Sequence, residues 1–170
     1  TPTVSVTAPT CTDAGFAQVT NYDGTLNYTL SSNNISIDGS GKITGAAGNY
    51  TVTVGNGSCS ATSASFSIAS KLVVPAVPTV NVIAATCSTA GSAQVSNYNS
   101  SLVYTVSPNT ANIDGSGKIT GAAGPYTVTA DNGSCTSTSA TFTIAGQLTT
   151  PATPTVSVTA PTCTDAGFAQ

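Results

Sequence analysis

Cysteines carry the clearest chemistry in this chain, and they recur at a regular spacing. Cys11 and Cys59 lie 48 residues apart, as do Cys87 and Cys135, while Cys163 follows alone. No Cys-x-x-Cys motif and no histidine accompanies them, so the pattern does not favour a zinc or redox site. Paired cysteines of this kind favour disulfides and therefore an oxidising, extracellular location.

An internal repeat accounts for the spacing. The segment Thr1–Gln18 returns letter for letter at Thr153–Gln170, and a diverged copy begins at Val77, which fixes a period of 76 residues. We predict β-sandwich repeats at residues 1–76 (type A) and 77–152 (type B), followed by the start of a third, type A repeat at residues 153–170. Because the copies alternate in type, we expect the chain to be a piece of a longer array.

Two disulfide connectivities respect this repeat. We predict pairing within each copy, Cys11–Cys59 and Cys87–Cys135, because it closes a loop inside one core and stabilises a fold by about 4 kcal/mol on the chain-entropy model. This pairing requires the two turns that carry the cysteines to lie at the same end of the sandwich. Cys163 is then unpaired. The alternative crosses the joint between copies, as Cys59–Cys87 and Cys135–Cys163.

Short runs of alternating apolar and polar residues indicate an all-β fold. A period of two predicts half-buried strands, and about seven such strands separated by turns are typical of an immunoglobulin-like β-sandwich, with a β-solenoid as the rival. Asn56-Gly57 predicts a type I′ hairpin turn, and paired prolines between copies predict extended, semi-rigid linkers. In the first copy the predicted strands are Thr3–Ala8, Gly15–Thr20, Leu26–Leu30, Ile35–Ile37, Lys42–Thr44, Tyr50–Val54 and Ser63–Ile68.

The scarcity of charge narrows the classes of function. The chain has three Lys or Arg and six Asp or Glu residues, no histidine, and a net charge of −3. General acid–base catalysis needs a group with a tuned pKa, and only isolated Asp and Lys on turns are present, so we predict no enzyme and no cofactor. Three lysines leave no basic surface for nucleic acid. No apolar run is long enough for direct membrane insertion of this segment.

The longest segment that is unchanged between copies contains an aspartate. Residues 37–48 and 113–124 share the sequence IDGSGKITGAAG, which places Asp38 and Asp114 in equivalent loops. Calcium ligation is one reading, but one carboxylate per loop is too few, so we favour a glycine-rich hairpin tip and predict no metal. Lys42 is four residues from Asp38 across a turn, which also disfavours an internal isopeptide bond.

Two tyrosines are candidates for ligand stacking. Tyr22 and Tyr98 fall in a turn, whereas the other aromatic residues fall on alternating strand positions that are more simply explained as core. A glycan-binding repeat would expose both rings on one face.

Nearly the whole chain resembles a known family of repeats. The pattern Cys…Ala-Gly-x-Ala-x-Val…Tyr…Gly-x-Tyr-Thr-Val-Thr-x-x-Asn-Gly-x-Cys…Phe-x-Ile runs from Cys11 to Ile68 and recurs 76 residues later. It is similar to the SprB-type repeats of giant cell-surface adhesins of gliding Bacteroidetes, which are substrates of type IX secretion. The resemblance implies an extracellular, cell-surface location and gliding motility.

The expected function is structural. We predict a stalk or filament segment of a large secreted adhesin, whose main partners are the neighbouring repeats of the same chain. The alternative is a module that binds surface polysaccharide or assembles with like filaments by sharing strands. Self-assembly of this kind predicts exposed strand edges.

Overall fold

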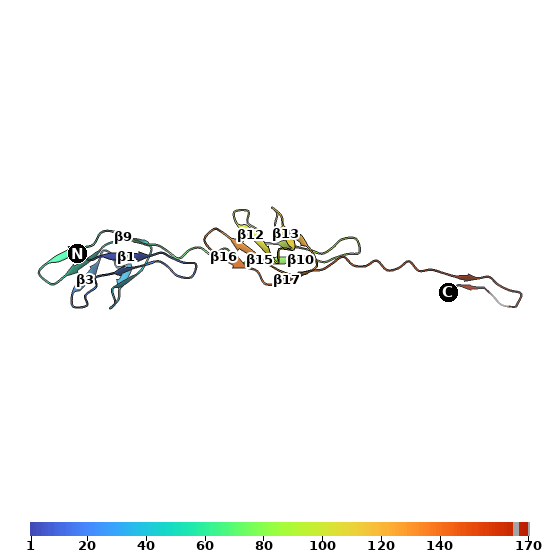
Figure 1. Cartoon of the computed structure of the whole chain (residues 1–170), viewed down its shortest axis with the longest axis horizontal. Coiled ribbons are helices and arrows are strands. Elements are labelled where there is room, and N and C mark those ends of the chain that lie inside the picture. Colours follow the sequence, from blue (N-terminus) through green and yellow to red (C-terminus); the bar gives the residue numbers. More distant parts are fainter. Residues whose placement is uncertain (165–166, 170) are drawn as a thin grey trace.

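The computed structural model describes residues 1–164 and 167–169, and this part of the chain is all-β, with antiparallel sheets and no helix. The all-β prediction is therefore confirmed. Figure 1 shows two groups of strands strung one after the other, followed by an extended tail. We call residues 1–76 the first half, residues 77–152 the second half and residues 153–170 the tail. The predicted third repeat includes residues 165, 166 and 170, which lie outside the described residues.

The first half contains one four-stranded sheet and two smaller ones. Strands follow the order β1-β2-β5-β4 in the large sheet and β3-β7-β8 in the second, and β6 pairs with β9. Their bounds are β1 Val4–Thr7, β2 Phe16–Val19, β3 Asn27–Leu30, β4 Ile35–Ile37, β5 Lys42–Gly45, β6 Gly48–Tyr50, β7 Val52–Gly55, β8 Ser60–Thr62 and β9 Phe66–Ile68.

The second half has the same strand order. Its sheets run β10-β11-β14-β13 and β12-β15-β16, and β17 pairs with the beginning of the long strand β15. The register also matches, because Val4 pairs with Val19 and Val80 pairs with Val95. The bounds are β10 Val80–Ile83, β11 Ser92–Val95, β12 Val103–Ser107, β13 Ala111–Ile113, β14 Lys118–Gly121, β15 Gly124–Asp131, β16 Thr136–Thr138 and β17 Phe142–Ile144.

Each half has its own apolar core. Alternate side chains of the strands face inward, so that Ile43 and Val52 are fully buried in the first half and Ile119 and Val128 in the second. The complete clusters are Ala17, Val19, Ile35, Ile43, Tyr50, Val52, Phe66 and Ile68, and Ala93, Val95, Ala111, Ile119, Tyr126, Val128, Phe142 and Ile144.

The hairpin between β7 and β8 forms, but not with the predicted turn. A type I′ turn needs positive φ at both central residues, whereas only Gly57, with φ of 92°, is positive in this turn. Asn56 keeps a negative φ because its side-chain Oδ1 accepts hydrogen bonds from the backbone N–H groups of Ser58 and Cys59. The loop is therefore a four-residue turn, Asn56–Cys59, organised by the asparagine side chain.

The tail forms a hairpin of its own. Strands β18 (Val158–Thr159) and β19 (Phe168–Ala169) pair with Val158 opposite Ala169, the register in which Val6 lies opposite Ala17 in the first half. Val158 is 78% exposed and Val156 65% exposed. The tail thus adopts the pairing of the β1–β2 hairpin, and its described valine side chains are exposed.

Candidate functional site

The only disulfide among the described residues joins the two halves. Cys11 is bonded to Cys135, 124 residues further along the chain, with their Cα atoms 5.8 Å apart. Cys59, Cys87 and Cys163 are free and exposed. The predicted pairs Cys11–Cys59 and Cys87–Cys135 are therefore wrong, and so is the alternative that pairs Cys59 with Cys87 and Cys135 with Cys163.

The reason is the position of the two cysteines within one half. Cys11 lies in the loop between β1 and β2, residues 8–15, which reaches toward the second half. The turn Asn56–Cys59 between β7 and β8 lies at the far end of the first half (Figure 1). The two cysteines of one copy therefore sit at opposite ends of the strands, a separation that no disulfide can span. We call residues 8–15 and 84–91 the first-cysteine loops, and Asn56–Cys59 and Asn132–Cys135 the cysteine turns.

Hydrogen bonds define the shape of the first-cysteine loop and attach it to the linker. The backbone N–H of Thr10 donates to the carbonyl of Asp13 at 2.8 Å, and the N–H of Asp13 donates to Thr10 Oγ1 at 2.9 Å. The N–H of Leu72 donates to the carbonyl of Thr10 at 3.0 Å, which ties the loop to the linker between the halves. Loop and linker therefore form one surface that faces the second half.

The cysteine turn of the second half contacts this surface. Asn132 Oδ1 accepts bonds from the N–H groups of Ser134 and Cys135, and Asn132 Nδ2 donates to the linker carbonyl of Val73 at 2.8 Å. Ser137 Oγ donates to the carbonyl of Ala76 at 3.1 Å. One asparagine thus shapes the turn and also binds the incoming linker.

Burial shows how closely the joint is packed. Cys135 is only 2% exposed, and Cys11 and Leu72 are half-buried, while Pro75 is buried. The two halves are therefore connected twice, once by the linker and once by the disulfide, with hydrogen bonds between the two connections. Two separated attachments restrain rotation that a single peptide linker would permit.

The two candidate stacking tyrosines are packed against their own halves. The ring of Tyr22 stacks on Tyr28 with centroids 4.7 Å apart, and the ring of Tyr98 stacks on Tyr104 at 4.9 Å. Each is half-buried, and an added Cβ on Gly41 would lie 2.7 Å from the Tyr22 ring, so the glycine backbone touches it directly. These rings are covered in large part by protein, which gives the glycan reading no support.

The aspartates of the unchanged loops cap their own hairpins. Asp38 Oδ1 accepts bonds from Ser40 Oγ at 2.7 Å, Ser40 N at 2.8 Å and Lys42 N at 3.0 Å, and Asp114 is bonded alike. The hydroxyl of Ser40, followed by these backbone bonds, lowers the pKa of Asp38 below its usual value. Lys42 Nζ lies 4.2 Å from the centre of the Phe16 ring. Over residues 1–164 and 167–169, no three His, Cys, Asp or Glu residues gather as metal ligands would.

Two comparisons with known proteins identify no family for this chain. No protein-family model matches it, and no curated protein matches it. Within the described residues, no helix is long and apolar enough to cross a membrane.

Cysteine spacing alone does not predict the joint, because it offers pairing within a copy and pairing between adjacent cysteines of consecutive copies. The signal that separates the two cysteines of a copy is the direction in which each strand runs. Cys11 follows β1, whereas Cys59 follows β7, which pairs with β3. Strands β1 and β7 end at opposite ends of the first half (Figure 1). Tracing strand directions through the hairpins would have separated the two cysteines of a copy.

Proposed function

We propose that this chain is a force-transmitting stalk segment of a large, secreted cell-surface adhesin, built from immunoglobulin-like repeats at residues 1–76 and 77–152. The observation that carries the proposal is the disulfide between Cys11 and Cys135, which joins consecutive repeats. The likeness of the Cys11–Ile68 pattern to SprB-type repeats supports an adhesin of gliding bacteria that is exported by type IX secretion. No catalytic role is assigned to the chain.

The disulfide changes the path that tension takes through the molecule. Force applied at the two ends runs from Thr1 to Cys11, crosses the sulfur–sulfur bond and continues from Cys135. The backbone between these cysteines is bypassed, so tension cannot pull it straight while the bond is intact. A stalk must resist stretching, and this connectivity provides that resistance by covalent means.

The same bond supports an extracellular location. Disulfides persist in oxidising environments and are rare in the cytosol. The low charge of the chain also suits a spacer, because a surface with few ionised groups exerts little electrostatic attraction on passing molecules.

Single-molecule stretching of the full chain, held by its two termini, tests the proposal. The chain from Cys11 to Cys135, a sequence separation of 124, would extend to about 400 Å if pulled straight. The oxidised chain should therefore lack that length and gain it on addition of a reductant. The double variant Cys11→Ser/Cys135→Ser should behave like the reduced chain, and Cys87→Ser should behave like the oxidised one. An oxidised chain that extends to full length would overturn the proposal.

A further inference from the structure

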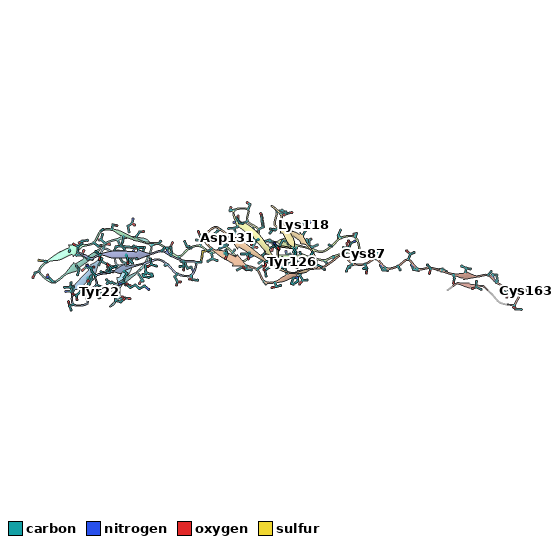
Figure 2. The ribbon with its side chains drawn as sticks, viewed as in Figure 1. Tyr22, Cys87, Lys118, Tyr126, Asp131 and Cys163 are labelled. Carbon is teal, nitrogen blue, oxygen red and sulfur yellow. A yellow bond between two sulfur atoms is a disulfide. The ribbon has the colours of Figure 1, made fainter. Side chains whose placement is uncertain are left out.

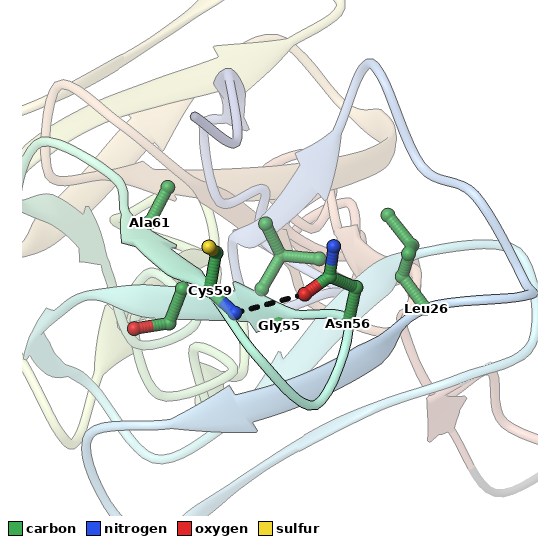
Figure 3. Close-up of a pocket in the computed structure, with 7 residues that line it drawn as sticks. Leu26, Gly55, Asn56, Cys59 and Ala61 are labelled. Carbon is green, nitrogen blue, oxygen red and sulfur yellow. Dashed lines mark hydrogen bonds between the residues drawn. The ribbon is translucent and has the colours of Figure 1, made fainter.

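The first half carries an open copy of the socket that is filled in the second half. A pocket of about 200 Å³ lies beside its cysteine turn (Figure 3) and is lined by Leu26, Val54, Gly55, Asn56, Cys59, Ser60 and Ala61. The residues 76 positions later include Asn132, Cys135 and Ser137, which bind Val73, Cys11 and Ala76 of the first half. The pocket therefore corresponds to the place where one repeat receives the preceding one.

The open turn has the shape of the filled one. Asn56 Oδ1 accepts bonds from the N–H groups of Ser58 and Cys59 at 3.1 and 2.9 Å, as Asn132 Oδ1 does in its own turn. Among the described residues, Asn56 Nδ2 has no hydrogen-bond acceptor, whereas Asn132 Nδ2 donates to the linker. The Cys59 thiol is exposed, while Cys135 is 2% exposed. Asn56 Nδ2 and the Cys59 thiol are therefore both accessible to a binding partner.

The opposite end of the molecule presents the matching surface. In the first-cysteine loop of the second half, residues 84–91, the N–H of Thr86 donates to the carbonyl of Thr89 at 2.8 Å. The N–H of Leu148 donates to the carbonyl of Thr86 at 2.9 Å. These bonds repeat those of Thr10 and Leu72 in the filled joint. Gln147 Nε2 also donates to the carbonyl of Cys87 at 2.7 Å. Figure 2 shows Cys87 at the end of the second half that faces the tail.

We propose that the Asn56–Cys59 socket binds the Cys87 loop of a second copy of this chain and is closed by a Cys59–Cys87 disulfide between the two molecules. This inference rests on the proposed stalk function, because the contact between molecules has the same geometry as the joint between the two halves. The Asn56–Cys59 turn lies at the end of the first half that faces away from the second half (Figure 1), and Cys87 lies at the end of the second half that faces the tail (Figure 2). Cys59 and Cys87 of one molecule therefore cannot pair with each other. Within the two described halves, the open socket lies at one end and the Cys87 loop at the other, so the association is head-to-tail and produces open chains.

The bond forms by oxidation of two thiols. The Cys59 and Cys87 sulfurs lose two protons and two electrons to a small-molecule disulfide such as oxidised glutathione, which is reduced to two thiols. The Cys87 thiolate first forms a mixed disulfide with one half of the oxidant, and the Cys59 thiolate then displaces that half. Docking of the loop in the socket selects this pair over random encounters between exposed thiols.

The test uses the full chain at high concentration in a glutathione redox buffer. An equal mixture of ¹⁵N-labelled and unlabelled protein is digested with trypsin, which separates Cys59 on peptide 43–71 from Cys87 on peptide 72–118. Hybrid cross-links between these two peptides should exceed Cys59–Cys59 cross-links roughly tenfold, equivalent to about 1.4 kcal/mol of docking free energy. Non-reducing gels should show a ladder of dimers, trimers and longer chains.

Variants identify the donor and the socket. Cys87→Ser and Cys59→Ser should each abolish the ladder, Asn56→Ala should slow its formation, and Cys163→Ser should leave it unchanged. A ladder that survives Cys87→Ser and disappears with Cys163→Ser would assign the loop to the tail and overturn the proposal, as would random pairing of all exposed thiols or a chain that stays monomeric. The Cys11–Cys135 cross-link, read from the same digest, reports separately on the joint that the stalk function needs.

Discussion

The two cysteine turns have the same sequence, Asn-Gly-Ser-Cys, and opposite surroundings. Asn132–Cys135 is covered by the first half, and Cys135 is 2% exposed, whereas Asn56–Cys59 faces solvent. The linkers differ in the same sense, because Pro75 is buried and its counterpart Pro151 is exposed. The turn is therefore shaped by its own asparagine, and its exposure is set by whether a neighbouring loop fills it.

The largest expected loss of stability comes from substitutions in the two cores. Ile43→Ala and Ile119→Ala each remove a fully buried side chain and should each cost about 2–5 kcal/mol of unfolding free energy. Because each half has its own core, the loss should appear only in the half that carries the substitution. Hydrogen exchange read by mass spectrometry on peptides from each half measures this. Loss of protection in both halves from either variant would show that the joint couples the cores.

A smaller effect isolates the joint itself. Asn56→Ala and Asn132→Ala both remove the acceptor that shapes a cysteine turn, but only Asn132→Ala also removes the bond to Val73. Asn132→Ala should therefore be more destabilising by about 0.5–1.5 kcal/mol, the net contribution of one hydrogen bond. Urea unfolding of the oxidised chain gives both values. Equal losses would mean that the linker contact contributes nothing to stability.

The smallest effect should be the same in both halves. The pKa values of Asp38 and Asp114 are lowered by the Ser40 and Ser116 hydroxyls and by backbone N–H groups. A depressed folded-state pKa gives stability that is present above the unfolded value, near 3.9, and lost as pH falls through the folded value. Carboxyl ¹³C titrations should give matching low midpoints for the two residues. Different midpoints would mean that the joint changes the pKa of Asp114, which the structure does not predict.

The sequence predicted the strands better than their connections. Apolar alternation located β1 to β5 and β9, but β8 was missed because Ser60–Thr62 has no large apolar side chain and pairs only at the edge of β7. The cysteine pattern predicts disulfides but not the correct pair, because the pairing depends on which end of each half a turn occupies. That is a property of three-dimensional topology, and residue spacing does not contain it.

Disulfide mapping of the oxidised chain tests the central claim most directly. Trypsin cuts after Lys42, Lys71 and Lys118, so Cys11, Cys59 and Cys87 fall on separate peptides and Cys135 shares peptide 119–170 with Cys163. The structure predicts that peptide 1–42 is linked to peptide 119–170, and that the link persists in Cys163→Ser. A link between peptides 1–42 and 43–71 would restore pairing within a copy and contradict the joint.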